Sequence, residues 1–174
     1  MIEDFVTEFA RYRSIGEKAI GQVPDEEDLN RVFGEENNSI AIVMRHIGGN
    51  LRSRFTDFLI SDGEKPWRNR DTEFENRQFT LDELNAVWRG GWEVLERELS
   101  TLSDADLERQ VSIRGQSLSV SAALARSVAH IAYHVGQIVL LARILKERDW
   151  QWISIPKGKS EEYNEAPDKE KKPV

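Results

Sequence analysis

Residues 129–137 read Ala-His-Ile-Ala-Tyr-His-Val-Gly-Gln and lie in a long apolar run with helical spacing, from about residue 119 to 148. The two histidines of this stretch, His130 and His134, are four residues apart. On an α-helix this spacing places both imidazoles on one face, about one turn apart, so that both can reach a single metal ion. The chain has three histidines, and the third, His46, lies in another apolar segment with helical spacing.

Apolar periodicity predicts four long helices and therefore an all-α fold, a four-helix bundle. The helices are expected at residues 2–23, from N-cap candidates at 37–39 to about 60, from a capping box at 80–83 to about 102, and from 119 or 120 to 148. Residues 25–36 are expected to form a loop with a short helical turn. Residues 110–120 alternate apolar and polar around Arg-Gly-Gln, which predicts a possible small β-hairpin before the last helix.

The connection between the second and third helices, residues 61–79, is long and has no clear periodicity. Antiparallel neighbours in bundles are usually joined by about 2–8 residues. This connection can reach about 60 Å when extended, which is enough to return along the bundle. We therefore expect a long crossover that lets the second and third helices run parallel. The bundle is expected to span residues 1–153, followed by an extended, largely disordered tail at 154–174.

The composition and charge of the chain disfavour several classes of protein. With 174 residues the chain is long enough for one domain, and its formal net charge of −7 is spread along the sequence, which disfavours nucleic-acid binding and anionic membranes. The absence of cysteine excludes disulfides and thiolate metal ligands. The acidic, amphipathic N-terminus is unlike a signal peptide, and polar residues interrupt the most apolar stretch, 135–145. We expect a soluble, cytoplasmic protein.

The histidines have two interpretations. Three imidazoles on two facing core helices would supply a catalytic site for zinc or a similar ion, with one coordination position open for water or substrate. The ion would act as a Lewis acid or lower the pKa of a bound water or thiol. Alternatively, each histidine is an ordinary half-buried residue bonded to a neighbour. No glutamate follows His130 in the His-Glu-x-x-His pattern, so the sequence gives metalloprotease chemistry no support.

Three polar residues on the same faces are further candidates. Asn50 is four residues after His46, and Gln137 is three after His134, so both amides are candidates to hydrogen bond a histidine or simply to satisfy a polar spot in the bundle. Arg126, one turn before His130, is either a contact for an anionic substrate group or a solvated arginine. The glycines at 48–49 lower helix propensity by about 1 kcal/mol each. They indicate either space for a ligand or close packing of another helix.

These residues carry a resemblance to a known family. The sequence Met-Arg-His-Ile-Gly-Gly-Asn at 44–50, with His130-x-x-x-His134 and Gly-Gln-Ile at 136–138, resembles the DinB/YfiT-like family over about residues 1–150. Residues 56–70 resemble an uncharacterised branch of it. The resemblance implies a bundle of down-up-up-down topology, a three-histidine site for zinc or nickel on His46, His130 and His134, and homodimers. The glycine pair and the long C-terminal extension depart from the family pattern.

The resemblance also implies a choice of activities. Characterised relatives include S-transferases and isomerases that use bacillithiol, mycothiol or glutathione, and presumed hydrolases. We therefore expect a metal-dependent enzyme in which bound water or a low-molecular-weight thiol attacks a small electrophilic molecule. The alternative is a non-catalytic bundle whose histidine cluster or metal is structural and serves a binding or stress-response role.

Overall fold

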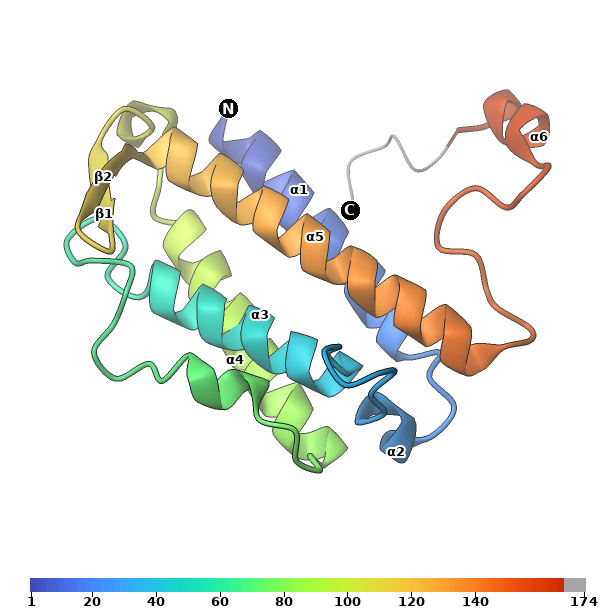
Figure 1. Ribbon diagram of the computed structural model, residues 1–174. Helices are drawn as coiled ribbons and strands as arrows, with labels where there is room; N and C mark the ends of the chain where they lie inside the picture. Colours follow the sequence, from blue (N-terminus) through green and yellow to red (C-terminus); the bar gives the residue numbers. More distant parts are fainter. Residues whose placement is uncertain (168–174) are drawn as a thin grey trace.

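Four long helices pack side by side in the computed structural model, which describes residues 1–167 (Figure 1). They are α1 (Ile2–Ile20), α3 (Ile40–Phe55), α4 (Leu81–Leu99) and α5 (Val120–Lys146). The shorter elements are α2 (Glu26–Leu29), the 3-10 turns η1 (Asp71–Phe74) and η2 (Asp104–Asp106), strands β1 (Gln110–Ile113) and β2 (Gln116–Ser119), and α6 (Ser160–Glu165). The predicted helical bundle and its small hairpin are both present.

The long crossover sets the directions of the helices. In Figure 1, α3 and α4 both begin at the end of the molecule where α2 lies and run towards the hairpin, whereas α1 and α5 run the other way. At the first end, the Asn30 side chain donates to the Phe79 carbonyl over 3.0 Å and accepts from the Phe79 amide over 2.9 Å. At the other end, the Gly63 amide donates to the Ser112 carbonyl over 2.8 Å. These bonds tie both ends of the crossover to the bundle.

The core is formed by the apolar stripes of the four helices. The largest side chains within it that are almost fully buried are those of Trp92, Phe55, Met44, Ile40, Ile47, Leu51, Leu84, Leu95, Leu107, Leu124, Ile131 and Ile138. Trp88 is also buried, with its ring centroid 5.6 Å from that of Trp92. Both tryptophans are therefore core residues.

Side-chain caps begin the helices where the sequence predicted them. The Ser39 hydroxyl accepts from the Ile42 amide, and the Ser119 hydroxyl accepts from the Ala122 amide, both over 3.2 Å. Thr80 opens α4 with a full capping box, in which the side chain of the N3 glutamate accepts from the Thr80 amide. Each cap satisfies an amide that has no partner within its own helix.

The helix ends were predicted less well. The structure ends α1 at residue 20 rather than 23, α3 at 55 rather than 60, α4 at 99 rather than 102, and α5 at 146 rather than 148. After α3, Thr56 is extended and Asp57 has a φ of 51°, which breaks the helix and turns Phe58 back onto Phe55 with ring centroids 5.1 Å apart. Burial of Phe58 in the core therefore outweighs the propensity of these five residues to continue the helix.

The β-hairpin is held against the crossover by one carboxylate. Arg114 and Gly115, with φ values of 53° and 71°, form its two-residue turn. The Asp62 carboxylate accepts from both of their amides over 2.8 Å, from the Ser112 hydroxyl over 2.5 Å and from the Glu64 amide over 2.7 Å. These hydrogen bonds, that from Ser112 foremost, hold the pKa of Asp62 well below its usual range.

Replacing Asp62 by asparagine should lower the free energy of unfolding by about 1–3 kcal/mol at pH 7, because an amide nitrogen then faces hydrogen-bond donors. A depressed carboxyl pKa stabilises the fold above the unfolded-state pKa, and this contribution is lost as the pH falls below about 4. The difference between wild type and variant should therefore shrink between pH 7 and pH 3 in urea titrations. Glu93→Gln, on the exposed face of α4, is the control and should match wild type at both pH values.

The last helices differ from expectation in two ways. Helix α6 forms within the segment expected to be an extended tail, and the last part of that tail, residues 168–174, lies outside the described residues. By length and hydropathy alone α5 is apolar enough to cross a membrane, although polar interruptions argued against this in the sequence. A core helix of a bundle has the same composition, and α5 contributes Leu124, Ile131 and Ile138 to the core. Its apolar character is therefore weak support for a membrane span.

Candidate metal centre

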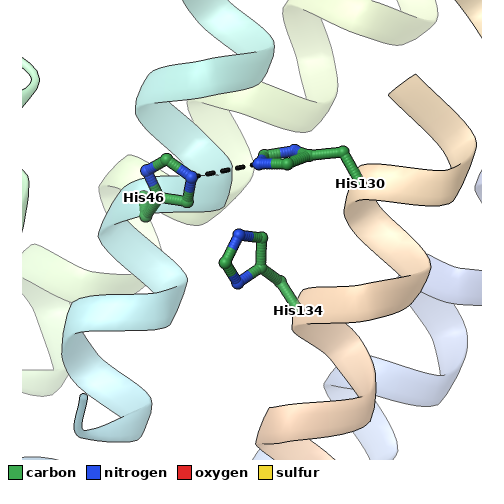
Figure 2. Close-up of side chains that lie close together, drawn as sticks. All are labelled: His46, His130 and His134. Carbon is green, nitrogen blue, oxygen red and sulfur yellow. Dashed lines mark hydrogen bonds between the residues drawn. The ribbon is translucent and has the colours of Figure 1, made fainter. Parts of the chain in front are cut away.

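The three histidines converge between α3 and α5. His46 projects from α3, and His130 and His134 project from successive turns of α5 (Figure 2). Each offers one ring nitrogen, and these three atoms lie within 4.8 Å of one another. The ring centroids are separated by 5.1 Å for His46 and His130, 4.7 Å for His46 and His134, and 4.6 Å for the α5 pair. The fold therefore brings together all three predicted ligands, and residues 1–167 contain no other group of three or more histidine, aspartate or glutamate side chains arranged so that they could hold one ion.

Hydrogen bonds fix which nitrogens can act as ligands. His46 Nδ1 lies 2.9 Å from Glu73 Oε2, and since a carboxylate only accepts, Nδ1 carries the proton. His134 Nδ1 lies 2.8 Å from Gln137 Oε1 and donates to it in the same way. Since Nδ1 of each ring is engaged in this bond, Nε2 is the nitrogen that is available to a metal ion. Metal-binding histidines usually have such a partner on their other nitrogen, because it orients the ring and raises its basicity.

Glu73 reaches His46 from the crossover. It lies in η1, is itself buried, and receives a bidentate pair of bonds from Arg68, Nε to Oε1 at 2.8 Å and Nη2 to Oε2 at 2.9 Å. Burial by itself raises the pKa of Glu73, but the hydrogen bonds from His46 and Arg68 outweigh it and hold the pKa below its usual range. The carboxylate is therefore ionised and fully used as an acceptor at neutral pH.

The glycine pair of α3 is explained by packing on both sides. A Cβ on Gly48 would lie 2.9 Å from the backbone carbonyl carbon of Val87 in α4, so α4 approaches this turn closely. A Cβ on Gly49 would lie 2.9 Å from Cδ of Glu73 and closer still to its Oε1. Of the two explanations left open by the sequence, close packing is thus correct, and at Gly49 it makes room for the carboxylate that holds His46.

His130 completes the site. Its Nε2 lies 3.1 Å from Nε2 of His46 (Figure 2). Burial, followed by the neighbouring His134 and His46, lowers the pKa of His130 to about 3, and burial also lowers the pKa of His134. His130 and His134 are therefore neutral near pH 7, the form that binds metals.

The donor set fits a divalent ion. Two imidazole nitrogens bound to tetrahedral zinc at about 2.0–2.1 Å lie about 3.3 Å apart, close to the 3.1 Å between His46 and His130. Three imidazole nitrogens from two helices, two of them on rings whose other nitrogen is hydrogen bonded, form the donor set of a site with an open coordination position. Without an ion, the His46 and His130 nitrogens can instead share one proton.

The three polar residues that the sequence marked as further candidates, Asn50, Arg126 and Gln137, do not all contact a histidine. Gln137 bonds His134, as its spacing predicted. Asn50 and Arg126 both line a cavity of about 180 Å³ that opens beside His46 and His130. Neither makes a hydrogen bond to a histidine in the described part of the chain.

Sequence reasoning missed Glu73 and Arg68. Both lie in the crossover, where no periodicity marks a buried face, and residues 61–79 contain several other acidic and basic residues. The available signal was indirect, because a histidine ligand needs a partner for its second nitrogen and Gly49 marks a place where a side chain enters. Neither signal identifies which acidic residue forms a hydrogen bond with the His46 ring.

Glu73→Gln should weaken metal affinity by about 10–100-fold, since an amide in place of the carboxylate removes the charge that makes His46 a better donor. The affinity is measured by competition with a chromophoric zinc chelator, on variant shown to be folded by circular dichroism. Glu75→Gln, two residues away and exposed, is the matched control. Equal affinities for wild type and a folded Glu73→Gln would show that this carboxylate does not support the ligand.

Comparison with known protein families places most of the chain in one of them. Residues 1–159 match the protein family described as "Protein of unknown function (DUF1572)". No curated protein and no solved structure matches the chain.

Proposed function

The chain belongs to the DUF1572 family, and from its site we propose that it is a metal-dependent enzyme of the DinB/YfiT-like kind. His46, His130 and His134 hold a divalent ion, with zinc or nickel the best candidates for imidazole ligands. The observation that carries this proposal is the convergence of three imidazoles, two buried and one half-buried, of which two have their second nitrogen bonded to Glu73 and Gln137. The helix directions in Figure 1 support a down-up-up-down topology of DinB type.

The surrounding residues prepare the site for a reaction. A bound ion supplies Lewis acidity and lowers the pKa of a water or thiol that occupies its open position. Glu73 and Gln137 hold the protons of His46 and His134 on the nitrogens that face away from that position. The cavity beside His46 and His130 has room for a small molecule. We propose S-transfer from a low-molecular-weight thiol to a small electrophile as the reaction, with hydrolysis as the version in which water replaces the thiol.

One observation favours a second candidate. The two Nε2 atoms of His46 and His130 are 3.1 Å apart, a distance at which they can share a proton without an ion. A non-catalytic bundle with a structural histidine cluster or metal, serving in binding or a stress response, is consistent with this contact.

The exposed apolar side chains and the net charge of the chain support proposals about its partners and its location. Apolar side chains on the outer face of α5 are exposed, with Tyr133 at 65%, Leu140 at 60% and Ile144 at 47%. This apolar stripe supports a homodimer in which α5 packs against a second copy. The net charge of −7 supports the proposal that neither nucleic acid nor an anionic membrane is a partner, and we propose a cytoplasmic location.

The test uses protein reconstituted with zinc or nickel. Glutathione, bacillithiol or mycothiol is added with a chromogenic aryl halide, so that a sulfur–carbon bond forms as halide leaves and the thiol proton passes to solvent. A p-nitrophenyl ester without thiol tests hydrolysis. We expect turnover that requires the ion and is lost in His134→Ala. Full metal loading without turnover for any combination would favour the non-catalytic bundle.

A further inference from the structure

The cavity beside the histidines is lined by an unusual number of arginines. Arg54, Arg68, Arg70, Arg114 and Arg126 all line this single cavity of about 180 Å³, and none of its lining residues is acidic. They come from α3, the crossover, the hairpin turn and α5, segments that are far apart in the sequence. The fold thus gathers positive charge at one place in a chain whose net charge is −7.

Nearby carboxylates balance only part of this charge. Glu64 accepts from both Arg54, at 3.3 Å, and Arg114, at 3.0 Å. The Arg68 guanidinium is engaged with Glu73, described above. Three of the five arginines therefore share two carboxylates.

The other two arginines lack a comparable partner. Arg70 lies 3.9 Å from Asp71, whose side chain is 95% exposed, so this pair is held in high dielectric and contributes little. Arg126 makes no hydrogen bond or ion pair with any of residues 1–167. The five guanidinium groups thus outnumber the carboxylates of Glu64, Glu73, Asp62 and the exposed Asp71 that lie near them, which leaves a net positive charge around the cavity.

Uncharged groups of the lining point to the same kind of ligand. The Ser127 hydroxyl, on a residue only 8% exposed, has no hydrogen-bond partner among the described residues, and the same holds for Nδ1 of His130. Both residues line the cavity, with the apolar side chains of Phe55, Phe58 and Ile113. A ligand that carries an acceptor for the Ser127 hydroxyl and an apolar body would match both the polar and the apolar groups of this lining.

We propose that this cavity binds the oxyanion group, carboxylate or phosphate, of a small amphipathic molecule. Arg126 and Arg70 supply the charge, and Ser127 donates to one of the oxygens. A planar guanidinium binds either oxyanion through two parallel hydrogen bonds. The inference rests on the proposed function in one respect, since it makes this molecule the substrate that lies beside the histidines and presents its reactive part to them.

The test measures ligand binding by titration calorimetry on metal-free protein, so that it does not depend on turnover. Three probes are used: phenylacetate, inorganic phosphate, and phenylacetamide, which keeps the apolar body of phenylacetate without its charge. We expect wild type to bind at least one of the anions and not phenylacetamide. Arg126→Gln should bind that anion at least about 10-fold more weakly, because a charge-assisted pair is lost.

Arg143→Gln is the matched control. It removes the same charge from the same helix, at an exposed arginine that stacks on Trp152 and does not line the cavity. It should leave the affinity within about twofold of wild type, while Arg70→Gln should weaken binding as Arg126→Gln does. Binding of phenylacetate identifies a carboxylated ligand, and binding of phosphate identifies a phosphorylated one.

Two results would overturn the inference: no binding of either anion to wild type, or equal weakening in Arg126→Gln and Arg143→Gln. Metal content determined on the same proteins separates this failure from that of the proposed function. A chain that holds its ion but no anion refutes only the anion site. A chain that binds the anion but no metal refutes only the metal-dependent enzyme.

Discussion

Replacing His130 by alanine should reduce bound zinc or nickel from about one equivalent per chain to background, with affinity lowered by more than about 100-fold. The reason is that loss of a ligand leaves two imidazoles, which are on different helices and do not form a closed chelate. His130 also faces His46 across 3.1 Å, so no neighbouring side chain can take its place without repacking. The measurement is metal content by mass spectrometry on untagged protein incubated with each ion.

Leu140→Ala is the control for this experiment. It shortens an exposed side chain on the same helix and should keep the wild-type metal content. His134→Ala should behave like His130→Ala, because it too leaves two imidazoles on different helices. Wild type that takes up no ion under any of these conditions would leave the histidines as hydrogen-bonded core residues, and the enzyme proposal would fall.

Gly91→Ala is expected to lower the free energy of unfolding by about 1–3 kcal/mol or more, although alanine normally stabilises a helix relative to glycine by about 1 kcal/mol. A Cβ on Gly91 would lie 2.6 Å from the Gly48 carbonyl oxygen and 2.7 Å from its Cα. Both neighbours are backbone atoms of α3, so no side chain can rotate away. The two helices would have to separate, and the cavity between them would cost packing energy.

The neighbouring glycine provides a control of opposite sign. A Cβ on Gly90 would meet nothing within 4 Å. Gly90→Ala should therefore stabilise the protein by about 0.5–1 kcal/mol, through helix propensity and a less flexible unfolded chain. Urea unfolding of both variants at pH 7 tests the pair. If the two substitutions change the free energy of unfolding in the same direction, the backbones of α3 and α4 do not approach each other at Gly48 and Gly91 as closely as the structure shows.

The sequence predicted the parts of the fold that depend on local pattern. Apolar periodicity located the four long helices, and the Thr80 capping box and the Ser39 cap located two of their starts. The alternation around Arg114 and Gly115 located the hairpin. Helix ends were harder to predict, because the end of α3 depends on whether Phe58 turns into the core, and this is decided by packing rather than by propensity.

The candidate site also has a part that the sequence predicted and a part that depends on packing. The sequence by itself determined that three histidines lie on the inner stripes of two helices, since i, i+4 spacing fixes which side chains share a face. Only the tertiary structure decided that Glu73 holds His46, that Gly49 leaves room for it, and that arginines from four segments meet at one cavity. These contacts join residues that are distant along the chain and have no periodic pattern, and they form only when α3, α5 and the crossover pack together.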